Sequence, residues 1–205
     1  MIRKLKFPFY MMLHPFQGLE RLKERTENYN LMAALLVFVY FLSQLFSEQV
    51  TSFSFNPANT ESVNVGMVFL VSVIPVILFS ASNWCLSTLT QGEATFSEIF
   101  TAVSFALLPV ILINITVAAV SNVMSLEEEL FFILFNGFKN LWFAAYLFVG
   151  IKTVQQFTFL KTVVSLLLTL AGMAVIAFLF ILVYSLFYQL FIFIGTIYNE
   201  LSFRM

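Results

Sequence analysis

The sequence predicts an all-α, polytopic membrane protein with five transmembrane helices and an amphipathic helix flanking them at each end. Of its 205 residues, 60% are hydrophobic and 10% are charged, and the mean hydropathy is +0.94. Ordinary globular proteins are about 25% charged, so the solvent for most of this chain must be lipid. The alternating pattern of a membrane barrel is absent, and backbone polar groups in lipid must then be paired within helices.

Five apolar runs are long enough for the ~20 residues that a helix needs to cross the hydrocarbon core. They are residues 31–49, 65–87, 100–122, 130–151 and 162–185. We therefore divide the chain into a basic head (1–30), a five-helix membrane domain (31–185) and a C-terminal amphipathic helix (186–205). The basic head is followed by a long apolar run from Leu31 without a small-residue cleavage signature, so we expect a retained span and not a signal peptide.

The basic residues predict the orientation of the chain in the membrane. Six of the ten lie before residue 26, namely Arg3, Lys4, Lys6, Arg21, Lys23 and Arg25. Loops 50–64, 88–99 and 123–129 contain none, whereas 152–161 contains Lys152 and Lys161. Because Lys and Arg accumulate in cytoplasmic loops, we expect a cytoplasmic N-terminus and an extracytoplasmic C-terminus.

Within the head, residues 15–27 are too polar to insert but place Phe16, Leu19 and Leu22 on one stripe. Two interpretations stay open: a helix lying on the cytoplasmic leaflet, with its basic residues near anionic lipid, or a short cytoplasmic helix packed on the loops.

The last apolar run is too long for one upright span. As a single helix, residues 162–198 would reach about 55 Å, well beyond the ~30 Å core. Its final part has a polar stripe formed by Ser185, Gln189, Thr196 and Asn199. We expect 186–203 to bend onto the outer surface or to pack against a partner.

The second span carries polar residues on one arc of the helix, at about 100° per residue. They are Ser72, Ser80, Asn83, Ser87 and Thr90. Such an arc is typical of a packing seam between helices, and a substrate path is the alternative. Pro75 here and Pro109 in the third span are expected to kink their helices.

The fourth span contains "NGFKN", which places Asn136, Lys139 and Asn140 on one face. A charge near mid-span is a functional candidate by default. Lys139 could instead snorkel to the interface, or 126–138 could lie in the interface so that the span starts later. In the loop before the third span, Gly92 is expected to supply the turn, and Thr95 with Glu98 fits a capping box. Solvation or capping accounts for Glu93 and Glu98.

Enzyme signatures are absent from the chain: there is no GxSxG, HExxH, CxxC, P-loop or dinucleotide fingerprint. His14 is the single His, there is no Asp, and Cys85 is the single Cys, so no intrachain disulfide can form. We expect no enzymatic activity, no cofactor, no metal site and no nucleic-acid partner.

Several segments in order along the chain resemble the bacterial branch of the Yip1 domain family. They are "MLHPFQGLERLKER", "NWCLSTLTQGEATFSEIF", "ALLPVIL", "LFVGIKTVQQFTFLKTV", "LTLAGMAVIAFL" and "IYNELSFR". The resemblance implies a five-span helical protein of the bacterial cell membrane with a cytoplasmic N-terminus. Eukaryotic members act in vesicle traffic and bind Rab GTPases, whereas many bacterial ones look like accessory proteins encoded near carbohydrate ABC transporters. Relatives often read Asp-Gly-Glu-Gly where this chain has Gln91-Gly92-Glu93-Ala94, which puts a cation-binding or doubly flexible loop in doubt.

The sequence therefore favours a non-catalytic integral membrane accessory or scaffold protein. Its expected partners are the lipid bilayer and other integral membrane proteins, with ABC transporter subunits among them. A small-solute transporter or channel is the alternative. The residues expected at a partner surface or polar seam are Asn83, Ser87, Thr90, Glu93, Asn136, Lys139 and Asn140.

Overall fold

The computed structural model describes residues 29–52, 54–55 and 63–202, and this part of the chain is helical, without strands. The expectations for His14 and for the helix at 15–27 lie outside the described residues. The helices are α4 (Asn30–Val50), α5 (Val65–Leu89), α6 (Phe96–Ala106), α7 (Leu108–Ser121), the 3-10 helix η2 (Leu126–Glu128), α8 (Glu129–Gln155) and α9 (Phe159–Ser202).

Five helical segments are long and apolar enough to cross a membrane, which confirms the predicted fold class. The third is built from α6 and α7 together, and the fourth from η2 and α8. Each begins within four residues of its predicted start.

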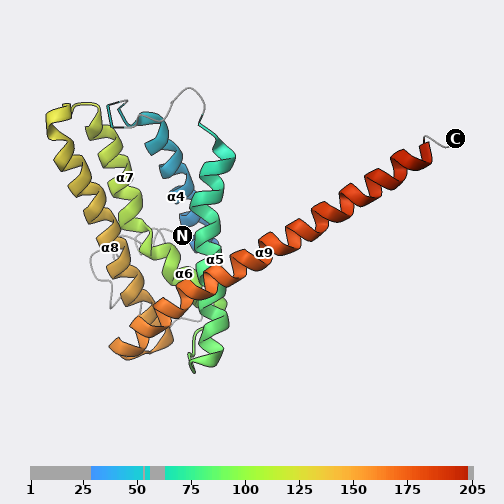
Figure 1. Ribbon diagram of the computed structural model, residues 1–205. Helices are drawn as coiled ribbons and strands as arrows, with labels where there is room; N and C mark the ends of the chain where they lie inside the picture. Colours follow the sequence, from blue (N-terminus) through green and yellow to red (C-terminus); the bar gives the residue numbers. More distant parts are fainter. Residues whose placement is uncertain (1–28, 53, 56–62, 203–205) are drawn as a thin grey trace.

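The helices run alternately up and down, so that successive loops lie at opposite ends of the bundle (Figure 1). Residues 90–95 and 156–158 are at one end, called here the Gly92 end. The connections after α4 and α7 are at the other, called here the Glu128 end. The alternation is what a five-span topology requires, and the assignment of the Gly92 end to the cytoplasm stays a prediction.

Side-chain caps fix where two of the helices begin. The Asn64 side chain accepts a hydrogen bond from the backbone N–H of Met67 at the start of α5. At α6, the Thr95 N–H donates to Glu98 Oε2 at 2.8 Å, and the Glu98 N–H donates to Thr95 Oγ1 at 3.4 Å. The predicted capping box is therefore confirmed, and it satisfies backbone N–H groups that have no partner inside the helix.

The third span is interrupted between α6 and α7, where Pro109 stands in the first turn of α7. Proline has no N–H and its ring clashes with the preceding turn, so the regular pattern of helix hydrogen bonds stops there. Instead, the Leu107 N–H bonds to the Ser104 carbonyl at 3.3 Å. The expected disruption at Pro109 is confirmed, whereas α5 continues as one helix through Pro75.

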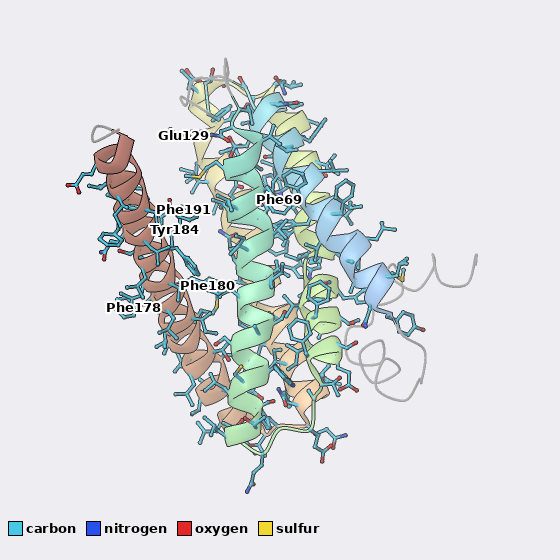
Figure 2. All side chains as sticks on the ribbon, turned by 90° about the vertical axis from the view of Figure 1, so that its right-hand side faces the viewer. Phe69, Glu129, Phe178, Phe180, Tyr184 and Phe191 are labelled. Carbon is cyan, nitrogen blue, oxygen red and sulfur yellow. The ribbon has the colours of Figure 1, made fainter. Side chains whose placement is uncertain are left out.

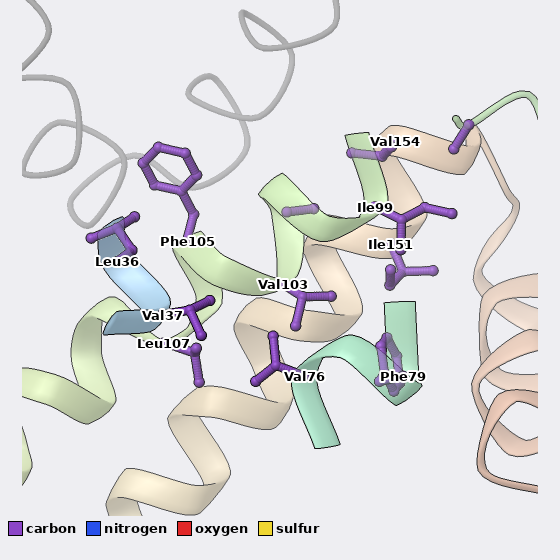
Figure 3. Packing of buried hydrophobic residues seen from close by; sticks show 12 residues of the cluster. Leu36, Val37, Val76, Phe79, Ile99, Val103, Phe105, Leu107, Ile151 and Val154 are labelled. Carbon is purple, nitrogen blue, oxygen red and sulfur yellow. The ribbon is translucent and has the colours of Figure 1, made fainter. Parts of the chain in front are cut away.

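The buried core lies where α6 is surrounded by α4, α5 and α8 (Figure 3). Ile99 of α6 and Ile151 of α8 are completely buried there, beside Val103 and Phe79. Small residues let α6 and α8 approach closely: a Cβ on Gly150 would lie 3.5 Å from the Cβ of Ala102. The third span is thus the central element of the bundle.

Helix α9 is 44 residues long and continuous, which corresponds to about 66 Å at 1.5 Å per residue. It runs unbroken through residue 185, so the bend expected there is not seen, and no proline occurs in α9 to force one. Its first part packs on α5, with Thr162, Ser165 and Thr169 buried.

From Phe178 onward, every described side chain of α9 is exposed. We call residues 178–202 the α9 arm. Figures 1 and 2 show it leaving the bundle obliquely, with Phe178, Phe180, Tyr184 and Phe191 distributed along it.

Candidate functional site

A buried hydrogen-bond network joins three helices near the Gly92 end. Asn83 of α5 donates from Nδ2 to Thr169 Oγ1 of α9 at 2.9 Å. Gln155 of α8 donates from Nε2 to Asn83 Oδ1 at 3.0 Å. All three side chains are at most 1% exposed. Because no water reaches these side chains, their polar groups would be unpaired without these hydrogen bonds.

The network extends to the backbone on both sides. The Ser82 hydroxyl donates to the Thr169 carbonyl at 2.9 Å, and the Thr169 hydroxyl donates to the Ser165 carbonyl at 2.7 Å. Gln155 Oε1 accepts a long hydrogen bond, 3.4 Å, from the N–H of Ala94 in the loop. We call Ser82, Asn83, Gln155 and Thr169 the seam. Its amides and hydroxyls all find partners, which is the pattern of a structural lock between helices.

Two glycines make room for the seam. A Cβ on Gly92 would collide with Gln155 Oε1, and one on Gly172 would collide with Ser82 Oγ. The turn itself is made by Gln91, whose φ is 55°, while no glycine in the described residues has a positive φ. The expectation that Gly92 supplies the turn is therefore wrong: Gly92 is needed for close approach to Gln155, and Gln91 adopts the left-handed conformation.

The predicted polar arc of α5 is only partly a contact between helices. Asn83 bonds to α8 and α9, but Ser80, Ser87 and Thr90 donate to carbonyls of their own helix, at Val76, Trp84 and Leu86 respectively. Glu93 is exposed in the loop. Gln155, Thr169 and Ser82 were missed because the contacts join distant parts of the sequence: Gln155 and Thr169 lie 72 and 86 residues from Asn83, and Ser82 bonds to the backbone of the same distant Thr169.

A second polar group lies within the fourth span. Lys139 Nζ donates to Asn114 Oδ1 of α7 at 2.8 Å and to Asn136 Oδ1 of α8 at 2.9 Å. Asn136 Nδ2 in turn donates to the Phe132 carbonyl at 3.0 Å. We call Lys139, Asn114 and Asn136 the Lys139 cluster. Asn114 was missed in the sequence, although a lone amide in the charge-free run "LINITV" is a signal that could have found it.

The Lys139 cluster is not satisfied by the described part of the protein. Asn114 is 2% exposed, and its Nδ2 has no hydrogen-bond partner. No described carboxylate forms an ion pair with Lys139. Asn140, predicted on the same face, is exposed and makes no hydrogen bond to any described residue. The structure therefore joins Asn136 and Lys139 but leaves Asn140 outside the cluster.

A small cavity of about 190 Å³ lies between α4 and α5. Its polar lining includes Tyr40, Gln44, Glu48 and Ser72, and Gln44 donates to the Tyr40 hydroxyl at 2.7 Å. Within the described ranges, no three His, Cys, Asp or Glu side chains come together as a metal site would require.

No curated protein and no solved structure matches the chain. The Yip1 domain matches residues 9–185, a stretch that reaches from the head through the first part of α9 and includes the seam and the Lys139 cluster. Since the match covers most of the chain and agrees with the five apolar helices, this protein belongs to the Yip1 domain family and is a membrane protein.

Proposed function

We propose that this protein is a non-catalytic accessory protein of the membrane that acts by binding other integral membrane proteins, with ABC transporter subunits among the candidate partners. The observation that supports it is the α9 arm. From residue 178 onward the described side chains are exposed, and most of them are large and apolar.

The length of α9 favours a protein as the cover for the arm. Transmembrane helices tilt by up to about 40°, and at that tilt a ~30 Å core is crossed in about 39 Å. Helix α9 measures about 66 Å, so hydrocarbon alone leaves a large apolar remainder uncovered. A helix of a partner protein would cover it, and the exposed Ser185, Gln189 and Thr196 would supply hydrogen bonds between helices.

Removal of residues 178–205 is the direct test. Full-length and shortened proteins would be purified from native membranes in mild detergent, and the membrane proteins that accompany each would be identified. We expect the shortened protein to lose its partner while its thermal unfolding stays near that of the full-length chain, because the arm lies outside the core.

Site-specific crosslinking makes the test quantitative. A photoreactive residue at Phe187 in the arm should give a defined crosslinked band, and the same residue at Phe38, exposed on α4, serves as the matched control. Equal crosslinking at both positions, or partners that are unchanged by the deletion, would contradict the proposal.

A small-solute transporter or channel is the second candidate, and the Lys139 cluster favours it. Polar groups at mid-span commonly mark ion or substrate pathways. Purified protein in liposomes should then conduct a solute, and Lys139→Leu should abolish the flux. Absence of flux would remove this candidate, and flux that is unchanged by Lys139→Leu would mean that Lys139 has a structural role.

A further inference from the structure

We propose that the Lys139 cluster binds a carboxylate carried on a transmembrane helix of a partner membrane protein. This inference rests on the proposed function and specifies one chemical feature of the partner. Four features of the cluster support it: the unused hydrogen-bond donors, the positive charge, the depth in the membrane and the adjacent surface of α8.

The groups left over in the cluster are all donors. A lysine ammonium has three N–H donors and no acceptor, and two of the three are used on Asn114 and Asn136. The Nδ2 of Asn114 is buried and donates to no atom of the described residues. The Oδ1 of each amide already accepts from Lys139. The site therefore lacks an acceptor, and the positive charge of Lys139 calls for an anionic one.

The depth of the cluster argues against a lipid headgroup or a dissolved anion. Lys139 lies ten residues after Glu129, where α8 begins, and sixteen before Gln155, where it ends. At 1.5 Å per residue these separations are about 15 Å and 24 Å, which places Lys139 well inside a ~30 Å core. An anion at this depth is most readily delivered by a side chain of another helix.

The surface beside the cluster suits such a helix. At about 100° per residue, Lys139, Asn136, Asn140 and Gly137 follow one another around α8 in steps of at most about 60°. They form a polar path from the cluster to the outside. A Cβ on Gly137 would meet no atom within 4 Å, and Asn140 is exposed. Small residues of this kind let a second helix approach closely, and an amide can bond across the contact.

Synthetic transmembrane peptides can serve as probes. A leucine-rich host peptide would carry one Glu at its centre, and matched peptides would carry Gln there or Glu near one end. Binding to the purified full-length protein in liposomes would be measured by energy transfer between fluorophores. We expect the central Glu peptide to bind about tenfold more tightly than the other two, in keeping with the energies measured for single interhelical polar contacts.

Variants of the protein show whether the preference depends on the cluster. Lys139→Leu should remove the preference for Glu, and Lys139→Arg should retain most of it. Gly137→Leu should weaken the binding of all three peptides, because it blocks the close approach of a second helix. Circular dichroism and thermal unfolding identify any variant that fails to fold. A preference for Glu that survives Lys139→Leu, or equal binding of the Glu and Gln peptides to the wild type, overturns the inference.

Two further outcomes separate this inference from the competing ideas. Chloride or acetate flux that depends on Lys139 would overturn it in favour of a solute site. If the arm deletion abolishes partner copurification while the wild type binds the Glu and Gln peptides equally, the proposed function stands and the carboxylate site is refuted. If neither change affects copurification but the peptides still distinguish Glu from Gln, the site stands and the role of the arm fails.

Discussion

The seam and the Lys139 cluster are two polar groups inside the same apolar bundle, and they differ in how their hydrogen-bonding groups are used. In the seam, Asn83 bonds to Gln155 and Thr169 on two other helices, and Thr169 also donates to the Ser165 carbonyl. In the Lys139 cluster, the Asn114 Nδ2 donates to no described residue, and no described carboxylate pairs with the charge of Lys139.

The difference indicates what each group is for. A satisfied network in a dry interior adds to stability and fixes how helices pack, so its residues are explained by the fold. An unsatisfied buried donor beside a cation costs stability, and the fold alone does not explain its presence. Substitutions in the seam should therefore lower the free energy of unfolding, whereas substitutions in the Lys139 cluster should change it little.

The largest effect is expected for Gly172→Leu. The new side chain would collide with Ser82 Oγ and separate α9 from α5, and overpacking of this kind costs about 2 to 3 kcal/mol of unfolding free energy. Gly195→Leu is the matched control in the same helix, because a Cβ there meets nothing within 4 Å. Thermal unfolding in mild detergent compares the two, and equal stability would show that α5 and α9 do not pack as described.

Gln155→Leu should lower the free energy of unfolding by somewhat less than Gly172→Leu does. It leaves Asn83 Oδ1 and the Ala94 N–H without their partner, and a lost buried polar contact is worth about 1 to 2 kcal/mol. Gln189→Leu, on the exposed arm, is the control and should leave the free energy of unfolding unchanged. A double-mutant cycle with Asn83→Leu should show coupling between the two sites, and additive losses would mean that the seam does not act as one network.

Thr95→Ala probes the loop that leads into the seam. Loss of the capping box at α6 should cost about 0.5 to 1 kcal/mol and should loosen the backbone beside Ala94. Thr88→Ala is the control, since the Thr88 hydroxyl bonds only to a carbonyl of its own helix. Unfolding curves and amide hydrogen exchange at residues 94–99 measure the effect, and identical protection in both variants would argue against it.

The smallest stability effect is expected at the Lys139 cluster. In Lys139→Leu, the hydrogen bonds lost to Asn114 and Asn136 are offset by removal of an unpaired charge from the apolar interior, so the unfolding free energy should change by no more than about 0.5 kcal/mol. The same detergent unfolding assay applies. A loss as large as that of Gln155→Leu would show that the cluster stabilises the fold as the seam does.

The sequence predicted the spans because hydrophobic length is a local property of the chain. The starts of α4, α5 and α8, the capping box at Thr95 and the interruption at Pro109 all depend on residues close together in the sequence. These features follow from rules that act over a few residues, and the structure contains all of them.

The two polar groups could be predicted only in part. The arc on α5 identified Asn83, but its partners Gln155 and Thr169 lie 72 and 86 residues away, and no local pattern relates them. Likewise, "NGFKN" pointed to Lys139, yet Asn114 on another helix accepts its hydrogen bond. The role of Gly92 was misassigned because the atom that it must avoid belongs to α8.

The α9 arm has a consequence for how complexes of this protein would be spaced. Its residues 178–202 extend for about 37 Å at 1.5 Å per residue. A partner held by the far part of the arm would stand away from the bundle. The protein would then act as a spacer as well as a tether. It would limit how far a partner can diffuse in the plane of the membrane, and it would keep that partner out of contact with the bundle.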